Sequence, residues 1–425
     1  MKHLLFIVTE SRSANGICTK AVMRACVARG YSVHCITNRE RDDQKGRDPK
    51  TVDGVTYETV KPRWQYRLQA QVAALPVGSI RRRLMQLVHN VVNKAKLFLS
   101  LPTWPWISPS YTCRIYKKAV SVCQRYPVDA VIPVYTQIDT LIAAHRLKKR
   151  YPSMAYVPYF LDALSAGYGP KMFSCAWVER RGLAWERRLL PRADRILMME
   201  SAKPHYERLK NELSYYDRMT FLSLPLFDPT LGESPSAASV REEDVIRLVF
   251  VGSIPAHIRD PHYFIELFHQ LPDARLRLTL MGSSTCEGYL RDAASRDARI
   301  TLLPAADHET ALRVMREADV LLNLGNNNAR MTPSKIFEYM SMGKPIVSTA
   351  PIADEPSIRY LDEYPCKYIV EEWRSPQAHI APLLSFLDDN RLYRIDPQTL
   401  ADAFYSYTPA AFLACLDEIL QEKHV

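Results

Sequence analysis

A hydroxyl, an ammonium group and a carboxylate lie close together in one short segment, at Ser334, Lys335 and Glu338. Residues three or four positions apart share one face of a helix, so all three can reach one ligand. Thr332 is a typical N-cap residue, and Pro333 suits the first helical position. A helix N-terminus with a hydroxyl and an ammonium group favours phosphate, and a carboxylate one turn further along can accept hydrogen bonds from a ribose diol. The segment predicts a nucleotide diphosphate site.

The elements around this segment predict its place at the edge of a sheet. Gly343 and Pro345 are typical of a helix end, about three turns after Thr332. Residues 346–349 then form a short strand. Upstream, apolar runs predict buried strands at Ile246–Val251, Leu276–Met281, Ile300–Leu303 and Val320–Leu324. Helices are expected between them, at 261–269, 286–294 and 308–317.

The N-terminal half has the same alternation of strands and helices. A strand at Leu4–Val8 is followed by a loop and a helix from Thr19 to Arg29, which Gly30 ends. Further strands are expected at Ser32–Thr37, Asp129–Val134, Met154–Phe160 and Arg195–Met199, and a further helix at Ile138–Lys149. Apolar runs without alternation indicate parallel strands that are covered on both faces.

We therefore predict an α/β fold of two doubly wound, Rossmann-like domains that face a cleft. The N-terminal domain spans 1–230 and carries an insert at 59–128. The C-terminal domain spans 240–400, after a stretch of linker composition. Residues 401–425 contain a last helix, which we expect to pack back across the domains.

Ligands of open parallel sheets bind at the carboxyl ends of the strands. In the N-terminal domain, Asn15 and Gly16 follow the first strand. In the C-terminal domain, Gly252 and Ser253 follow the first strand, and Arg259 lies a few residues further on. These residues are the predicted lining of the cleft.

The segment Pro333–Val347 resembles glycosyltransferase family 4, which has the GT-B fold. It is similar to the form of the motif found in bacterial capsule, O-antigen and exopolysaccharide enzymes. Shorter matches to the family are Phe250–Ser253, Leu280–Gly282, Ala318–Leu322, Asn15-Gly16 and Gly30–Val33.

The resemblance implies roles for individual residues. Glu338 would bind the donor ribose, and Ser334 and Lys335 would lie beside the diphosphate. Arg259 would neutralise the leaving diphosphate. Gly252, Ser253 and Thr332 complete the expected donor site. Cleavage of a sugar–phosphate bond develops negative charge on the diphosphate, which preorganised cations stabilise most in the transition state. The resemblance implies retaining transfer without a metal, and the sequence has no Asp-x-Asp motif. No metal or cofactor is predicted beyond the nucleotide sugar.

The sequence departs from the family signature at Met331, seven residues before Glu338, where the signature has a first glutamate. Contact with the transferred sugar would then fall to backbone groups or to the run Gly325–Asn328. Asp162 ends an N-terminal strand where relatives often carry a histidine near the reacting sugar. The resemblance makes it a candidate catalytic residue.

The cysteines point to a reducing environment. Nine are scattered along 425 residues, without a Cys-x-x-Cys pair or a His/Cys cluster. This pattern argues against a disulfide framework or a structural zinc site. The apolar start is short for a signal peptide, and no apolar run is long enough for a transmembrane helix. We expect a cytoplasmic protein, soluble or peripheral on a membrane.

The positive charge is concentrated in residues 59–128, which contain twelve Lys/Arg and no Asp or Glu. The rest of the chain holds 44 basic and 46 acidic residues. A helical stretch at 80–99 mixes arginines with apolar residues, which favours the surface of an anionic membrane. Two alternatives stay open: a partly buried structural insert, and a nucleic-acid site built on the same basic and aromatic residues. Nucleic acid is the least favoured of the three and is not an expected partner.

These features together predict a glycosyltransferase. It would move a sugar from a nucleotide diphosphate sugar to a hydroxyl of a lipid-linked or oligosaccharide acceptor in cell-surface polysaccharide synthesis. One alternative is a nucleotide-sugar 2-epimerase of the same fold. Another is a catalytically silent partner subunit, which Met331 makes conceivable. An oxidoreductase is disfavoured because neither first strand leads into Gly-x-Gly-x-x-Gly.

Overall fold

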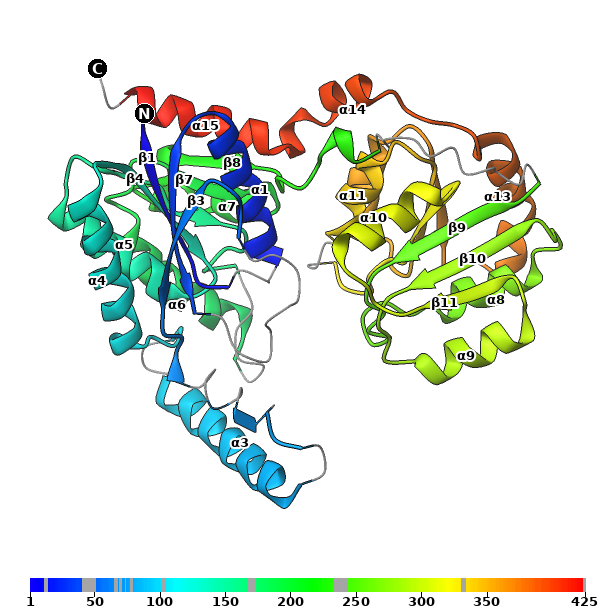
Figure 1. Ribbon diagram of the computed structural model, residues 1–425, viewed down its shortest axis with the longest axis horizontal. Coiled ribbons are helices and arrows are strands. Elements are labelled where there is room, and N and C mark those ends of the chain that lie inside the picture. Colours follow the sequence, from blue (N-terminus) through cyan, green and yellow to red (C-terminus); the bar gives the residue numbers. More distant parts are fainter. Residues whose placement is uncertain are drawn as a thin grey trace. The chain divides into compact units, whose positions relative to one another are not determined.

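A computed structural model of the 425-residue chain divides into two compact units (Figure 1). Unit 1 contains Met1–Pro225 and Ser406–Val425, and unit 2 contains Leu226–Tyr405. The structure describes the chain except for residues 11–13, 40–50, 65–67, 69–70, 73, 77–78, 101–103, 167–172, 233–243, 330–333 and 423–425.

Unit 1 is built on a parallel sheet with the order β3-β2-β1-β4-β6-β7-β8, in which β5 also pairs with β4. Its strands are β1 (His3–Val8), β2 (Ser32–Asn38), β3 (Val55–Val60), β4 (Val128–Tyr135), β5 (Ala155–Tyr156), β6 (Tyr159–Phe160), β7 (Ile196–Met199) and β8 (Met219–Leu222). Its helices are α1 (Ala14–Ala28), α3 (Ile80–Ser100), α4 (Pro109–Arg125), α5 (Ile138–Arg150), α6 (Cys175–Leu189), α7 (Lys203–Arg208) and α15 (Pro409–Glu422).

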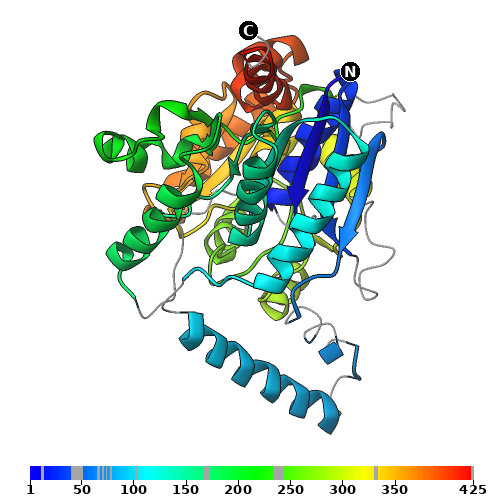
Figure 2. The ribbon, with the colours of Figure 1, turned by 90° about the vertical axis from the view of Figure 1, so that its left-hand side faces the viewer.

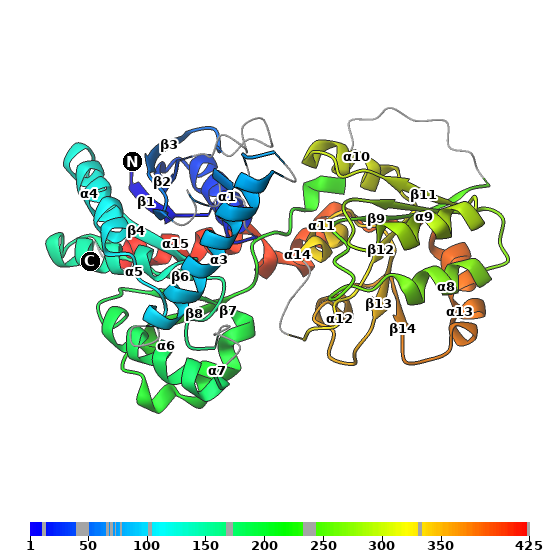
Figure 3. The same cartoon turned by 90° about the horizontal axis from the view of Figure 1, so that it is seen from below.

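Unit 2 is built on a second parallel sheet, with the order β11-β10-β9-β12-β13-β14. Its strands are β9 (Ile246–Val251), β10 (Leu276–Met281), β11 (Ile300–Leu303), β12 (Val320–Asn323), β13 (Ile346–Ala350) and β14 (Lys367–Glu371). Its helices are α8 (His262–Gln270), α9 (Glu287–Arg296), α10 (His308–Glu317), α11 (Lys335–Ser341), α12 (Ile358–Asp362), α13 (Pro376–Asn390) and α14 (Pro397–Ala403). Figure 3 shows β12, β13 and β14 side by side in this sheet.

The prediction of doubly wound α/β units is confirmed, with two corrections near the expected sites. The first helix begins at Ala14 and not at Thr19, so Asn15 and Gly16 lie in its first turn and not in a loop. The expected strand at 154–160 is split into β5 and β6. Pro158 lies between them, and a proline has no N–H to donate to a neighbouring strand.

The last helix, α15, belongs to unit 1 and packs on α1. Lys2 Nζ donates to Leu420 O at 2.5 Å, and Arg29 Nε lies 3.3 Å from Asp417 Oδ2. The chain therefore returns to the first unit after it has completed the second. Packing of this helix across both domains stays a prediction.

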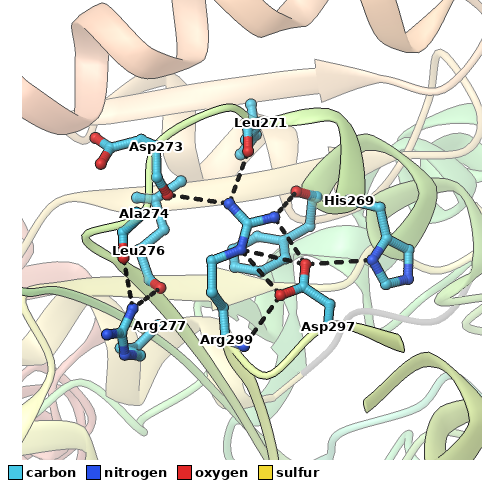
Figure 4. A network of polar contacts seen from close by, with 9 residues as sticks. His269, Leu271, Asp273, Ala274, Leu276, Arg277, Asp297 and Arg299 are labelled. Atoms are coloured by element: carbon cyan, nitrogen blue, oxygen red, sulfur yellow. Dashed lines mark hydrogen bonds and ion pairs between the residues drawn. The ribbon is translucent and has the colours of Figure 1, made fainter. Parts of the chain in front are cut away.

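An arginine clamp holds the amino-terminal edge of the sheet in unit 2 (Figure 4). Arg299 donates from Nη1 to Leu271 O and Asp273 O at 2.7 and 3.0 Å, and from Nη2 to Phe268 O at 3.1 Å. Its guanidinium also pairs with Asp297, at 2.7 Å between Nη2 and Oδ2. Phe268 and Leu271 lie at the end of α8 and Asp273 lies just beyond it, so Arg299 caps that helix and ties it to the start of β11.

Lys344, in the Met-Gly-Lys-Pro part of the sequence motif, has a similar structural role. Its buried ammonium group donates to the carbonyls of Met315, Arg316 and Ala318 at the end of α10. Gly343, just before it, has a φ of 65°, a conformation that favours glycine and lets the chain turn out of α11.

Candidate functional site

The strand order of unit 2 creates a topological switch point between β9 and β12. From β9 the chain proceeds outward to β10 and β11, and from β12 it proceeds in the other direction to β13 and β14. Connections diverge at such a point and leave a crevice at the carboxyl ends of the two strands. Here the crevice is bordered by the segment after β9, which contains Gly252 and Arg259, and by the segment after β12, which leads to α11.

Two glycines bring the backbones after β9 and β10 into direct contact. A Cβ atom on Gly282, whose φ is 148°, would lie 1.8 Å from the carbonyl oxygen of Gly252. Gly252 N also donates to Met281 O at 2.9 Å, and Ser283 Oγ lies 3.3 Å from Ser253 Oγ. The predicted Gly252–Ser253 segment is therefore a rigid double loop with its main chain open to close approach.

Arg259 lies against this loop. Its Nη1 donates to Ser253 O at 2.9 Å, and its guanidinium carbon lies 5.9 Å from the centre of the Phe250 ring. Nε is buried and has no hydrogen-bond partner in the part of the chain that the structure describes. Burial lowers the pKa of Arg259 from its ordinary value, while the Tyr339 and Glu355 side chains oppose that shift. A half-buried cation with an unused donor is suited to an anionic ligand.

The motif helix α11 spans seven residues, shorter than predicted. Ser334 is its N-cap, but the Ser334 side chain makes no capping hydrogen bond. Lys335 Nζ lies 2.6 Å from Glu338 Oε2, and both side chains are about a quarter exposed or less. The predicted neighbours Lys335 and Glu338 are thus together on one helix face. The predicted N-cap Thr332, together with Met331 and Pro333, lies outside the described residues.

Tyr339 attaches this helix to the end of β9. Its buried hydroxyl accepts from Val251 N at 2.8 Å and donates to Val251 O at 3.1 Å. Burial raises the pKa of Tyr339. The Arg259 charge opposes this increase, and the Glu338 charge adds to it. The tyrosine therefore gathers α11, Gly252 and Arg259 at the switch point.

Sequence reasoning missed Glu355, which is buried in the segment after β13. Its Oε1 accepts from Asn326 N at 3.1 Å, and its Oε2 accepts from Ser357 N at 2.7 Å. Asn327, which follows Asn326, donates from its main-chain N to Ile258 O at 2.8 Å. The segment after β12 is therefore tied to the segment that carries Arg259. Burial raises the pKa of Glu355, and the Arg259 charge opposes this. A lone Glu in a loop gives no signal in one sequence.

Glu372 was also missed. It follows β14 at the same edge of the sheet, and the Thr349 hydroxyl hydrogen-bonds to it. Thr349 Oγ1 also accepts from Gly325 N at 2.9 Å. Burial raises the pKa of Glu372 to about 7.

Unit 1 has its own switch point between β1 and β4, and Asn15 spans it. Asn15 Nδ2 donates to Tyr135 O at 3.3 Å, and Thr9 Oγ1 lies 2.7 Å from Thr136 Oγ1. Asn15 and Gly16 therefore lie where a ligand of this sheet is expected, although the helix places the Asn15 side chain against the main chain of β4.

Asp162 is exposed just after β6, near the same edge. Burial is the main cause of the raised pKa of Tyr135, and the charges of Glu186 and Asp162 add to it. Asp162 therefore lies near Tyr135, at the end of β4. Three residues on, Ser165 N donates to the buried Glu186 carboxylate at 2.9 Å, and Tyr206 donates to the same oxygen, also at 2.9 Å. The Asp162 turn is thus fixed from behind while its carboxylate stays accessible.

The described residues contain no group of three or more His, Cys, Asp or Glu side chains placed to hold a metal ion. Within the same described ranges, no helix has the length and apolar character of a membrane span.

Comparison with solved structures identifies the architecture. The chain is similar to sucrose-phosphate synthase from Thermosynechococcus elongatus, with a TM-score of 0.59 and 14% identity over 99% of both chains. It is also similar to Anabaena HepE in complex with UDP-glucose, with a TM-score of 0.60 and 13% identity over 99% of this chain and 100% of that one. A third similar structure is a trehalose-6-phosphate protein from E. coli bound with UDP-2-fluoro glucose, with a TM-score of 0.58 and 12% identity over 100% and 99% of the two chains.

These likenesses, with the two doubly wound units, show the GT-B fold. Residues 246–388 also match the protein family described as "Glycosyl transferases group 1". The chain is a glycosyltransferase of the GT-B type. The matched residues include the whole switch-point crevice of unit 2, from β9 to α13. No curated protein sequence matches the chain.

Proposed function

We propose that this glycosyltransferase moves a sugar from a nucleotide diphosphate sugar to a hydroxyl of a lipid-linked or oligosaccharide acceptor. The proposal rests on one observation above all: Tyr339 ties α11 to Val251, at the end of the strand that leads into Gly252 and the segment of Arg259. Two cations, Arg259 and Lys335, and the Glu338 carboxylate are then supplied to one crevice. This is the combination that a diphosphate and a ribose require.

In the proposed reaction, Arg259 and Lys335 stabilise the negative charge that develops on the departing diphosphate. Glu338 accepts hydrogen bonds from the ribose hydroxyls, and Ser334 lies beside the phosphates. The main chain of Gly252 and Ser253 approaches the donor closely, and Thr332, which lies outside the described residues, stays a predicted member of the site. The proposed transfer retains the configuration of the sugar. It uses no metal, because Arg259 and Lys335 supply the positive charge that a metal would otherwise supply.

A UDP-sugar is the proposed donor, since two proteins of similar fold are bound with UDP-glucose or its fluoro analogue. The acceptor binds in unit 1 near Asn15, Gly16 and Asp162, and Asp162 has a direct role at the reacting sugar. The product belongs to a cell-surface polysaccharide, such as a capsule or an exopolysaccharide. The enzyme works at the cytoplasmic face of a membrane, on an anionic surface that it meets through residues 59–128.

Titration calorimetry with UDP and with GDP tests the donor site. Wild-type protein should bind UDP more tightly than GDP, and Glu338→Ala should weaken UDP binding at least tenfold, about 1.4 kcal/mol. Glu287→Ala, at an exposed carboxylate elsewhere in unit 2, should bind like the wild type. If neither nucleotide binds, the chain is a silent partner subunit and the proposal fails.

Product analysis without acceptor tests the chemistry. Incubation with a panel of UDP-sugars should give slow hydrolysis to UDP and free sugar. Recovery of an epimerised nucleotide sugar would instead identify a 2-epimerase, in conflict with the proposed transfer.

A further inference from the structure

Helix α3 presents an apolar stripe to solvent. Along its first 14 residues no side chain is buried. Ile80, Leu84, Leu87, Val88 and Val91 are 76%, 59%, 62%, 50% and 64% exposed. Soluble proteins rarely leave several neighbouring large aliphatic side chains in water, so this stripe calls for a partner.

The described residues in the rest of unit 1 do not supply that partner. Among the described residues, no helix or strand packs extensively on α3. Figures 1 and 2 show the helix without another helix or strand beside it. For the part of the window that α3 occupies, this arrangement favours an exposed helix over a partly buried structural insert.

The exposed apolar residues lie on one face of the helix. At 3.6 residues per turn, positions 80, 84, 87 and 91 form a single line. The opposite face is polar, with Gln86 donating from Nε2 to Asn90 Oδ1 at 3.1 Å and with Asn93 Nδ2 lying 3.2 Å from His89 Nε2. Such two-faced helices rest in the boundary between water and lipid.

The charge of α3 favours anionic lipid. Three consecutive arginines, Arg81 to Arg83, follow Ile80 in the first turn of the helix. Arg82 Nη1 donates to the neutral carbonyl of Leu75 at 3.1 Å, and no ion pair between described residues involves the three arginines. The nearest carboxylate along the chain, Glu58, is already paired with Lys118 at 3.2 Å and with Arg125, both on α4. The positive charge of α3 therefore stays available to lipid headgroups.

We propose that α3 lies in the plane of an anionic bilayer surface, with the Ile80–Leu84–Leu87–Val91 stripe in the acyl boundary and the arginines at the headgroups. This inference deepens the membrane partner proposed above and assigns it to one helix face. It does not depend on the donor chemistry. At 21 residues the helix is about 32 Å long, and its arginine-rich first turn suits an in-plane position.

Two other partners fit less well. Nucleic acid would use the arginines but would leave the leucine and valine side chains in water. A second copy of the chain could bury the stripe, but it would bring together two helices without a single carboxylate to offset their arginines. An anionic bilayer accommodates both the apolar stripe and the arginines.

Vesicle flotation of the full chain tests the assignment. The wild type should float with vesicles of phosphatidylcholine and 30% phosphatidylglycerol, and much less with phosphatidylcholine alone. Leu84→Ser with Leu87→Ser and Val91→Ser should lower partitioning by roughly tenfold or more per side chain. Arg81→Gln with Arg82→Gln and Arg83→Gln should lower it by about 100-fold on the anionic vesicles.

The matched control changes three residues of the opposite face, Gln86→Ser, Asn90→Ser and Asn93→Ser, and should float like the wild type. If the leucine variant floats as well as the wild type, the helix face is wrong even though the membrane partner survives. Wild-type protein that stays unfloated, forms a dimer through the stripe or binds RNA through the arginines would overturn the proposal. UDP and GDP calorimetry on the same samples separates these results from a failure of the donor site.

Discussion

The buried hydroxyl of Tyr339 takes the place of a neighbouring strand for Val251, by accepting from its N–H and donating to its carbonyl at 2.8 and 3.1 Å. Pairing between β9 and β12 stops at Val249 and Leu321, so the two strands separate before Val251. An unpaired main-chain group is costly when buried. The tyrosine removes that cost while the crevice stays open.

Tyr339→Phe should therefore destabilise unit 2 and weaken donor binding together. Loss of both hydrogen bonds is expected to cost about 1–3 kcal/mol of stability, and nucleotide affinity should fall because α11 is no longer fixed at the strand end. Calorimetry with UDP and GDP and thermal unfolding measure the two effects. Tyr364→Phe is the control, since its buried hydroxyl donates to Lys344 O at 2.7 Å, beyond the other end of α11. Equal loss of affinity in both variants would contradict the specific role of Tyr339.

Removal of the Arg259 cation should slow the transfer step. Arg259→Ala is expected to lower kcat by roughly 100- to 1,000-fold, the range seen when one preorganised donor to a developing anion is lost. Arg259→Lys should recover part of this rate, because it keeps the positive charge. Recovery should be incomplete, because lysine lacks the guanidinium fork, which donates to Ser253 O through Nη1 and leaves Nε for the ligand. Steady-state kinetics with a saturating donor give the ratio. Arg291→Ala, at an exposed arginine of unit 2, should keep the wild-type rate.

Glu355 should position the Arg259 loop without touching the donor. Glu355→Gln keeps the shape of the side chain but weakens the charge-assisted hydrogen bonds to Asn326 N and Ser357 N. We expect a donor KM raised by about tenfold, with a smaller change in kcat. Ser357→Ala, which removes only the 3.2 Å hydroxyl contact to Glu355 Oε1, should have a much weaker effect. An unchanged KM in Glu355→Gln would show that the loop holds its position without the carboxylate.

The sequence predicts the central strands better than the edges of the sheets. β1, β4, β9 and β12 are buried, and their apolar runs mark them within one or two residues. β3, β8 and β14 were missed, and each is an edge strand. Their burial is partial along most of their length, so they lack the continuous apolar run that marks a covered parallel strand.

The candidate site shows the same division between local and distant information. Lys335 and Glu338 were predicted as neighbours because helix spacing alone brings them together. Glu355 could not be predicted, because it reaches Asn326 across 29 positions through a loop with no periodic pattern. Tyr339 lies in the motif, yet its bond to Val251 joins residues 88 positions apart. Contacts of this kind depend on the strand order, which one sequence does not reveal.

Glu372 should make unit 2 less stable as the pH rises. Its folded pKa is about 7, above the ordinary value of 4.5, so the folded state prefers the protonated carboxyl. Stability is highest below about pH 4.5 as far as this group is concerned, and it falls as the pH rises from there to 7. Glu372→Gln should remove that slope and be more stable than the wild type at pH 8, with little difference at pH 4.5. Hydrogen exchange of the β13 and β14 amides measures this in unit 2 alone. If Glu372→Gln kept the wild-type pH dependence of stability, another titrating group would be responsible for it.

Asp297 should have the opposite pH dependence at the other edge of the same sheet. The Arg299 guanidinium lowers the pKa of Asp297 from 3.8 to about 2, and both side chains are largely buried. A carboxyl with a lowered folded pKa stabilises the fold above its unfolded pKa, and this contribution is lost as the pH falls from about 4 to 2. The shift corresponds to about 2 kcal/mol.

Asp297→Asn should therefore reduce protection of the β10 and β11 amides at pH 7, and the difference from the wild type should shrink below pH 3. Hydrogen exchange at both pH values measures it. Asp292→Asn, which breaks the exposed pair with Arg296, should cost less than about 1 kcal/mol at either pH. Because Arg299 also donates to three carbonyls at and just after the end of α8, the variant should keep that helix capped and lose only the carboxylate part of the clamp. Equal protection of wild type and variant at pH 7 would mean that these carbonyls alone hold Arg299 in place.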